Sequence, residues 1–171
     1  MNFEIRQADY KNPTQMNQIC QLLNEYASEP MGGGVPIQPD RINQLKKGLG
    51  EFPLAFSLIV YDQEDPIGLA NCFFGFSTFA ARKLINIHDL MVSKKFRGKG
   101  ISQLLLKRIE EIGYENNCVK ITLEVLENNE IAKNSYQKFG FTSYELSSET
   151  GQALFWQKSL DAEQLNGCHQ S

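Results

Sequence analysis

The chain has 171 residues, of which 42% are hydrophobic and 22% charged, which suits one globular domain with a hydrophobic core. Its net charge of −3 provides no overall field to recruit nucleic acid or an anionic membrane. No apolar segment approaches the roughly 18 residues that span a bilayer. The chain starts without a signal-peptide pattern, and its four cysteines form no CxxC pair. We therefore expect a cytoplasmic protein with reduced thiols and no bound metal, nucleic acid or membrane.

Hydrophobic periodicity and turn residues predict elements in the order β-α-α-β-β-β-α-β-α-β-β. This order packs most simply as an α/β sandwich around one central sheet. We expect residues 1–160 to form a single domain and residues 161–171 to form a tail. The predicted elements are a strand at 3–6, a helix from Pro13 to Tyr26, a short helix at Pro39–Lys47, strands at Leu54–Tyr61, Ile67–Phe79 and Leu84–Val92, a helix at Ile101–Ile112, a strand at Val119–Val125, a helix from Asn129 to Gly140, and a hairpin of Phe141–Leu146 with Ala153–Lys158.

Apolar residues change parity within the fourth predicted strand. They stand first at odd positions, Ile85 and Ile87, and then at even positions, Leu90 and Val92. Such a change is typical of a β-bulge, which we place near His88–Leu90. A bulge leaves backbone groups unpaired, and these can pair with an extended ligand or stabilise an oxyanion.

A basic turn with two glycines, Lys94–Gly100, follows this strand and precedes the predicted helix at Ile101. The first N–H groups of a helix lack intrahelical partners and carry the positive end of its dipole, so such a turn is a place to hold phosphates. Gly98 and Gly100 allow the main chain to come close to a ligand. The alternative interpretation is an ordinary turn before a helix.

Two motifs make the chain similar to the GNAT superfamily of acetyl-CoA-dependent N-acetyltransferases. The pyrophosphate signature of that family, Q/R-x-x-G-x-G/A, is matched by the run Arg97–Ser102, with serine in place of the final glycine or alanine. The second signature, N-x-x-A-x-x-x-Y-x-x-x-G-F, is met in full by Asn129, Ala132, Tyr136, Gly140 and Phe141.

Within the superfamily the chain resembles the diamine (spermidine/spermine) and thialysine acetyltransferases as far as Lys158. The cues are Gly50–Pro53 before the second strand, Asp89, and Leu146–Glu149. One run, Phe76–Ala81, lacks the acidic and tryptophan residues that the polyamine enzymes carry there.

The resemblance implies a mixed, mostly antiparallel central sheet of about seven strands with helices on both faces, and a homodimer. It also implies acetyl-CoA as cosubstrate, with the strand backbone along its pantetheine arm, the basic turn at its pyrophosphate, and Lys94, Lys95 and Lys99 near its 3′-phosphate. The residues implied to bind acetyl-CoA are Leu90, Met91, Val92, Arg97, Gly98, Lys99, Gly100, Ile101, Ser102, Gln103, Asn129 and Asn134.

Two residues are implied to be catalytic, because the family transfers acetyl directly to a neutral amine. Tyr136 would donate a proton or a hydrogen bond to the departing sulfur; the alternative is a helix tyrosine packed on the sheet. His88 stands where the polyamine enzymes carry glutamate, and a group with pKa near 6.5 suits removal of a proton from an alkylammonium. The alternative for His88 is a structural histidine on a half-buried strand.

Three further residues are candidates for the acceptor site. Asp89 either attracts a cationic amine, orients His88, or satisfies backbone N–H groups of the bulge. Glu25 and Tyr26 precede the glycine-rich loop Gly32–Gly34, which is either a lid over the acceptor or an ordinary flexible loop.

The function predicted from these residues is acetyl transfer to a primary amine of a small molecule. The alternatives are acetylation of a protein lysine or N-terminus, and an acetyl-CoA-binding sensor without turnover. Loss of Tyr136 would have favoured the sensor, but this tyrosine is present.

Overall fold

The structure, a computed structural model, describes residues 3–144 and 153–158. The chain divides into two units, Met1–Phe139 and Gly140–Ser171. The strands are β1 (Phe3–Gln7), β2 (Ala55–Asp62), β3 (Asp65–Ser77), β4 (Arg82–Val92) and β5 (Ile121–Leu123). The helices are α1 (Pro13–Ala27), α2 (Pro39–Glu51), α3 (Ile101–Glu115) and α4 (Glu130–Phe139), with two short 3₁₀ turns, η1 (Pro30–Gly32) and η2 (Lys94–Phe96).

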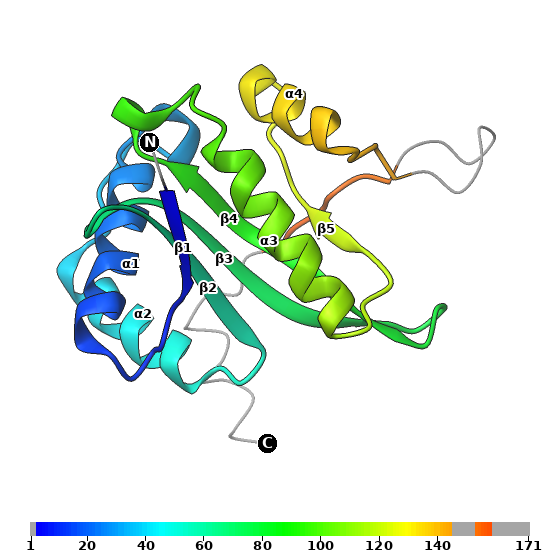
Figure 1. Ribbon diagram of the computed structural model, residues 1–171, viewed down its shortest axis with the longest axis horizontal. Coiled ribbons are helices and arrows are strands. Elements are labelled where there is room, and N and C mark those ends of the chain that lie inside the picture. The colour runs from blue at the N-terminus through cyan, green and yellow to red at the C-terminus, as the bar shows by residue number, and fades with distance from the viewer. Residues whose placement is uncertain (1–2, 145–152, 159–171) are drawn as a thin grey trace. The chain divides into compact units, whose positions relative to one another are not determined.

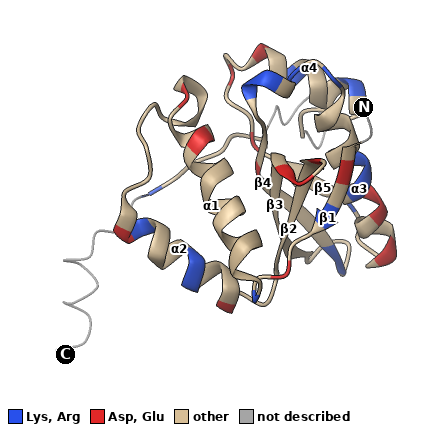
Figure 2. Cartoon of the chain, turned by 60° about the vertical axis from the view of Figure 1, so that its left-hand side comes forward, with Lys and Arg blue, Asp and Glu red and all other residues tan. Residues whose placement is uncertain are grey.

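The strands of the first unit form one sheet in the order β1-β2-β3-β4-β5 (Figure 1). Neighbours from β1 to β4 are antiparallel, whereas β5 lies parallel to β4. The helices α1 and α2 cover one face of this sheet and α3 covers the other, as Figure 2 shows from the side. The predicted mixed, mostly antiparallel sheet with helices on both faces is therefore confirmed.

The predicted count of about seven strands is not confirmed. Residues 141–144 and 153–158 form no strand in the described part of the second unit, although the N–H of Ala153 donates to the carbonyl of Tyr144 at 2.9 Å. Successive side chains Leu154, Phe155 and Trp156 are all exposed, without the alternation that a half-buried strand requires. The remainder of the predicted hairpin, 145–152, lies outside the described residues.

Each face of the sheet has its own apolar core, because strand residues alternate between faces. On the α1 face the buried cluster consists of Met16, Ile19, Leu22, Leu23, Leu49, Ile59, Tyr61, Leu69 and Met91. On the α3 face the helix buries Ile101, Leu105, Leu106, Ile109 and Ile112. In Figure 2, α1 is uncharged over most of its length, whereas α3 carries residues of both charges. Within the described residues, no helix is long and apolar enough to cross a membrane.

The predicted bulge is confirmed, and its position explains the change of parity. Asn71 of β3 pairs with Asp89 and the next residue, Cys72, pairs with Ile87, so His88 is the inserted residue of β4. The insertion keeps Ile87 and Leu90 on one face, because both pair with even-numbered residues of β3. Asp89 and Met91 consequently point to the α1 face.

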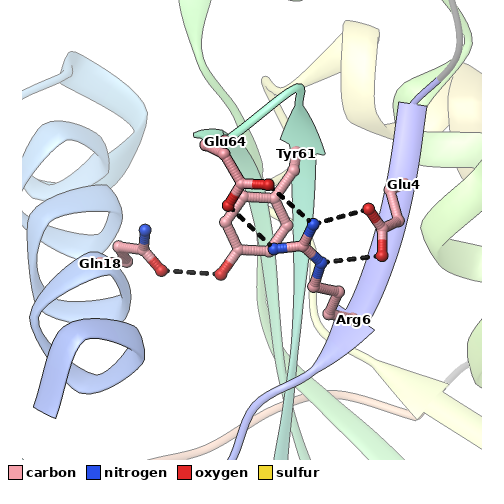
Figure 3. Close-up of polar contacts among 5 residues, drawn as sticks. All are labelled: Glu4, Arg6, Gln18, Tyr61 and Glu64. Atoms are coloured by element: carbon pink, nitrogen blue, oxygen red, sulfur yellow. Dashed lines mark hydrogen bonds and ion pairs between the residues drawn. The ribbon is translucent and has the colours of Figure 1, made fainter. Parts of the chain in front are cut away.

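A cluster of charges at β1 is satisfied within itself (Figure 3). The guanidinium of Arg6 donates to Glu4 at 2.7 and 2.8 Å and to Glu64 at 3.2 and 3.3 Å, and its carbon lies 4.5 Å from the centre of the Tyr61 ring. The Tyr61 hydroxyl donates to Gln18 of α1 at 2.7 Å. The hydrogen bonds that Arg6 donates to Glu4 and Glu64 raise its pKa, so the cation is fixed. We call these five residues the Arg6 cluster.

Candidate active site

The glycine turn predicted to hold phosphate lies between η2 and α3. Gly98 and Gly100 have φ angles of +76° and +80°, and Gly100 is the N-cap of α3. No side chain caps this helix, and a Cβ on either glycine would meet no atom within 4 Å. The first N–H groups of α3 therefore lack a side-chain acceptor beside open space, which is a geometry that binds an anion.

Three lysines flank this turn. Lys94 and Lys95 belong to η2, and Nζ of Lys99 lies 4.7 Å from the centre of the Phe96 ring. None of the ion pairs found among the described residues includes these lysines. Their charges are available to a ligand at the turn.

The side chain of Arg97 is engaged inside the protein. Its Nε donates to the carbonyl of Val92 at 2.9 Å, and its Nη2 donates to both carboxylate oxygens of Glu29 at 2.6 and 2.7 Å. Arg97 thus ties the end of β4 to the segment after α1. A ligand at the turn would meet its backbone rather than a free guanidinium.

The next motif residues are engaged as well. Ile101 is 1% exposed and packs near Gly68 of β3. Ser102 Oγ lies 3.1 Å from Ser135 Oγ, and Gln103 Nε2 donates to the carbonyl and hydroxyl of Ser135 at 2.9 Å each. The serine that departs from the family pattern thus has a partner on α4. These bonds fasten α4 to the first turn of α3.

Tyr136, the predicted general acid, follows Ser135 on α4. The helix is placed by its own caps: Asn129 Oδ1 accepts the N–H of Ala132 at 3.2 Å, and Gly140 has a φ of +108°. Burial, with a smaller effect of Tyr26, raises the pKa of Tyr136 to about 12. Its phenol therefore stays protonated and can donate a hydrogen bond.

The edge of β4 that faces β5 is open beyond the bulge. β5 pairs only with Ile85–Ile87, so residues 88–92 have no strand on that side within the described chain. Met91 is 3% exposed and its side chain lies in the α1 core, whereas Leu90 and Val92 are half-buried. The backbone of these residues is open to a ligand along this edge, apart from the Val92 carbonyl, which accepts from Arg97.

Asp89 and Tyr26 are brought together with the catalytic candidate. After burial, Asp89 is the next cause that raises the pKa of Tyr26, followed by Glu29, and Tyr26 in turn affects Tyr136. The Tyr26 hydroxyl donates to the carbonyl of Met31 at 3.3 Å, which fastens η1 to the end of α1. Tyr26 therefore lies near enough to both Asp89 and Tyr136 to interact with them electrostatically.

His88, the inserted residue of the bulge, is exposed. Its ring meets that of Phe73 edge-on, with centroids 5.7 Å apart, and Phe73 meets Phe52 in the same way at 5.5 Å. Among residues 3–144 and 153–158 the imidazole has no hydrogen-bond partner that would fix its tautomer. The position suits a group that exchanges protons with solvent, and it gives the site an aromatic wall.

Glu25 is hydrogen-bonded to the segment that precedes the basic turn. Its carboxylate accepts the hydroxyl of Ser93 at 3.0 Å and lines an open cavity of about 550 Å³ with Gln21, Asp65 and Lys94. Glu25 therefore supports the start of the basic turn. That Glu25 contacts the acceptor stays a prediction.

The remaining predicted residues lie on or before α4. The Asn129 side chain is used as a helix cap, and Asn134 is exposed one residue before Ser135. No group of three or more His, Cys, Asp or Glu within 3–144 and 153–158 is arranged to hold a metal ion.

Sequence reasoning missed three residues behind Asp89. Asn71 Nδ2 donates to Asp89 at 2.9 Å, and Asn71 is joined to Ser57 and Tyr10. The available signal was a serine and an asparagine inside the apolar runs of β2 and β3. It also missed Ser135, whose role depends on how α4 meets α3.

Known proteins resemble this chain in sequence and in fold. A thialysine N-epsilon-acetyltransferase of Bos taurus is 27% identical over 131 residues, which are 71% of this chain and 75% of that protein. The human spermidine/spermine N(1)-acetyltransferase-like protein 1 is 31% identical over 161 residues, which are 90% of this chain and 22% of that longer protein. A solved aminoglycoside acetyltransferase from a soil metagenomic sample shares the fold, with a TM-score of 0.75 over 93% of this chain and 97% of that one, at 14% identity.

The family assignment follows from a family profile that matches most of the chain. The profile described as Acetyltransferase (GNAT) family matches residues 16–141, from α1 to the end of α4. This span contains the uncapped turn at α3, the bulge of β4 and Tyr136. The chain therefore belongs to the GNAT family of N-acetyltransferases.

Proposed function

We propose that this enzyme transfers acetyl from acetyl-CoA to a primary amine of a small molecule by direct attack on the thioester. The observation that carries the proposal is the junction of α3 and α4, where Ser135 joins the uncapped first turn of α3 to the helix of Tyr136. These hydrogen bonds hold the turn that we propose to bind phosphate and the buried phenol of Tyr136 in a fixed arrangement. Relatives named for thialysine and for spermidine and spermine support a small amine as acceptor.

The turn has the chemistry that acetyl-CoA requires. The free N–H groups after Gly98 and Gly100 would receive the pyrophosphate, with Lys94, Lys95 and Lys99 supplying positive charge near the 3′-phosphate. The open backbone edge at residues 88–92 would hold the pantetheine arm as an added strand. Asn134 is exposed on α4 and stays a candidate for contact with acetyl-CoA, and the side chains of Arg97, Ser102 and Gln103 would act by shaping the turn.

Tyr136 would stabilise the sulfur as the carbon–sulfur bond breaks. With a pKa of about 12 against about 8.5 for a thiol, complete transfer of its proton is uphill by roughly 5 kcal/mol. A hydrogen bond that strengthens as negative charge develops on sulfur avoids most of this cost. We therefore assign Tyr136 as a hydrogen-bond donor to the thiolate, which takes its final proton from solvent.

The acceptor ammonium must lose one proton before its nitrogen attacks the carbonyl carbon. His88 is exposed at the bulge and can take this proton directly or through water, and Asp89 can hold the amine beside it. His88→Ala should then flatten the rise of kcat/KM with pH near neutrality. An unchanged pH profile would remove His88 from the mechanism.

The test is release of free thiol from acetyl-CoA against a panel of polyamines, thialysine, lysine, amino sugars and a lysine peptide. We expect release with a small amine, and a loss of about a hundredfold in kcat for Tyr136→Phe. Tyr114→Phe is the matched control, because Tyr114 lies on α3 and is 77% exposed. Release with the peptide alone, or tight acetyl-CoA binding without release on any amine, would contradict the proposed function.

A homodimer and a cytoplasmic location stay predictions. Light scattering on the purified chain tests the dimer.

A further inference from the structure

Two polar residues are buried in the apolar core of the described chain, Ser57 at 0% and Asn71 at 3% exposure. They are direct partners across β2 and β3, and Asn71 is in turn the partner of Asp89 on β4. Three polar side chains therefore form a straight row across the central strands. The row ends at Asp89, next to the inserted residue of the bulge.

The hydrogen bonds of this row point in one direction. Ser57 Oγ donates to Asn71 Oδ1 at 2.6 Å, and a hydroxyl has one hydrogen, so Tyr10 must donate to Ser57 across their 2.9 Å contact. Asn71 Nδ2 donates to Asp89 Oδ2 at 2.9 Å. Every donor from Tyr10 onward thus points toward the carboxylate.

Folding does not require polar residues at these positions. Their neighbours along β2 and β3 are buried apolar side chains, and an asparagine is disfavoured in a strand interior. Burying a polar group costs free energy unless it is hydrogen-bonded, and here every such group in the described residues has a partner. A row that is satisfied throughout fixes one arrangement of its members, including the rotamer of Asp89.

We propose that Asn71, Ser57 and Tyr10 are positioning residues that hold Asp89 to receive the acceptor ammonium. Oδ2 is engaged by Asn71, whereas Oδ1 has no partner among the described residues and is left for the substrate. A fixed carboxylate beside the open edge of β4 selects a protonated alkylamine over a hydroxyl or an amide. This inference rests on the proposed function and assigns roles that the family motifs do not include.

Two tyrosines allow a matched test. The Tyr10 hydroxyl bonds to Ser57 in the row, and the Tyr61 hydroxyl bonds to Gln18 in the Arg6 cluster, both within the part of the molecule that α1 covers. With spermidine and thialysine as probes, Asn71→Leu should raise the amine KM about tenfold and Tyr10→Phe about threefold, with the KM of acetyl-CoA unchanged. Tyr61→Phe should leave the KM of the amine and the KM of acetyl-CoA unchanged.

A second readout does not depend on turnover. The side-chain amide signals of Asn71 in a ¹H–¹⁵N spectrum should shift in Asp89→Asn and in Tyr10→Phe, and stay in place in Tyr61→Phe. The inference is overturned if the amine KM is unchanged in Asn71→Leu. It is also overturned if the side-chain amide signals of Asn71 do not shift in Asp89→Asn. Absence of thiol release by the wild type contradicts the proposed function instead, and the amide signals then decide whether the row holds Asp89.

Discussion

The Arg6 cluster and the glycine turn before α3 are both rich in charged groups. In the cluster these groups have partners, whereas at the turn the lysines are left open among the described residues. Arg6 is held by two carboxylates and a ring, and each of its neighbours has a partner inside the cluster (Figure 3). At the turn, Lys94, Lys95 and the first N–H groups of α3 are left without acceptors in the described chain. Charge that is compensated serves the fold, and the open charge at the turn supports the proposal that the turn binds an anion.

The largest expected difference is between Tyr136, on the helix that Ser135 joins to the glycine turn, and Tyr61 of the Arg6 cluster. Burial raises the pKa of Tyr136 to about 12 from its ordinary value of 10, so the folded protein binds this proton more tightly than the unfolded chain. The raised pKa of Tyr136 therefore adds roughly 2–3 kcal/mol to the free energy of unfolding. This stabilisation is complete below pH 10 and is lost as the pH rises toward 12.

Denaturant unfolding between pH 9 and 12 measures this effect. Tyr136→Phe should flatten the loss of stability with pH, and Tyr61→Phe should flatten it less, because Arg6 opposes the rise in the pKa of Tyr61. Equal slopes in the wild type and Tyr136→Phe would mean that the phenol is not buried as described.

Closing the turn should weaken cosubstrate binding by a smaller amount. A Cβ at Gly100, whose φ is +80°, strains the N-cap and narrows the approach to the N–H groups, so Gly100→Ala should raise the Kd of acetyl-CoA about tenfold. Gly48→Ala is the control, because a Cβ there also meets open space without a positive φ. Calorimetry that finds the same Kd for both variants would exclude the turn as the binding site.

Removing one carboxylate from each region should have the smallest effect. Glu29 is 24% exposed and receives two bonds from Arg97, so Glu29→Gln should cost under about 1 kcal/mol of stability. Glu64 is 83% exposed, and Glu64→Gln should leave the Tm unchanged. If Glu64→Gln lost more stability than Glu29→Gln, the Arg6–Glu64 ion pair would contribute more to folding than the Arg97–Glu29 pair, contrary to this expectation.

Local signals in the sequence predicted much of this fold. The parity change in β4 located the bulge, Asn129 and Gly140 marked the ends of α4, and Gly98 and Gly100 marked the turn. Each of these features depends on residues that are close in the chain, where turn and cap preferences act directly.

The parts that were missed depend on pairing between distant segments. The row from Tyr10 to Asp89 exists only because the registers of β2, β3 and β4 align Ser57 with Asn71 and Asn71 with Asp89. The hydrophobic pattern of each single strand does not predict how the residues of β2, β3 and β4 are paired. The Arg97–Glu29 and Gln103–Ser135 contacts likewise need the packed positions of α1 and α4.

The most direct test is a ¹H–¹⁵N titration of the protein with acetyl-CoA. The account predicts shifts of the backbone amides of Gly98, Gly100, Ser102 and Gln103, with the side-chain Nε–H signal of Arg6 unchanged. Shifts that leave the first turn of α3 untouched, or that appear at the Arg6 cluster instead, would contradict the assignment of the open turn as the cosubstrate site.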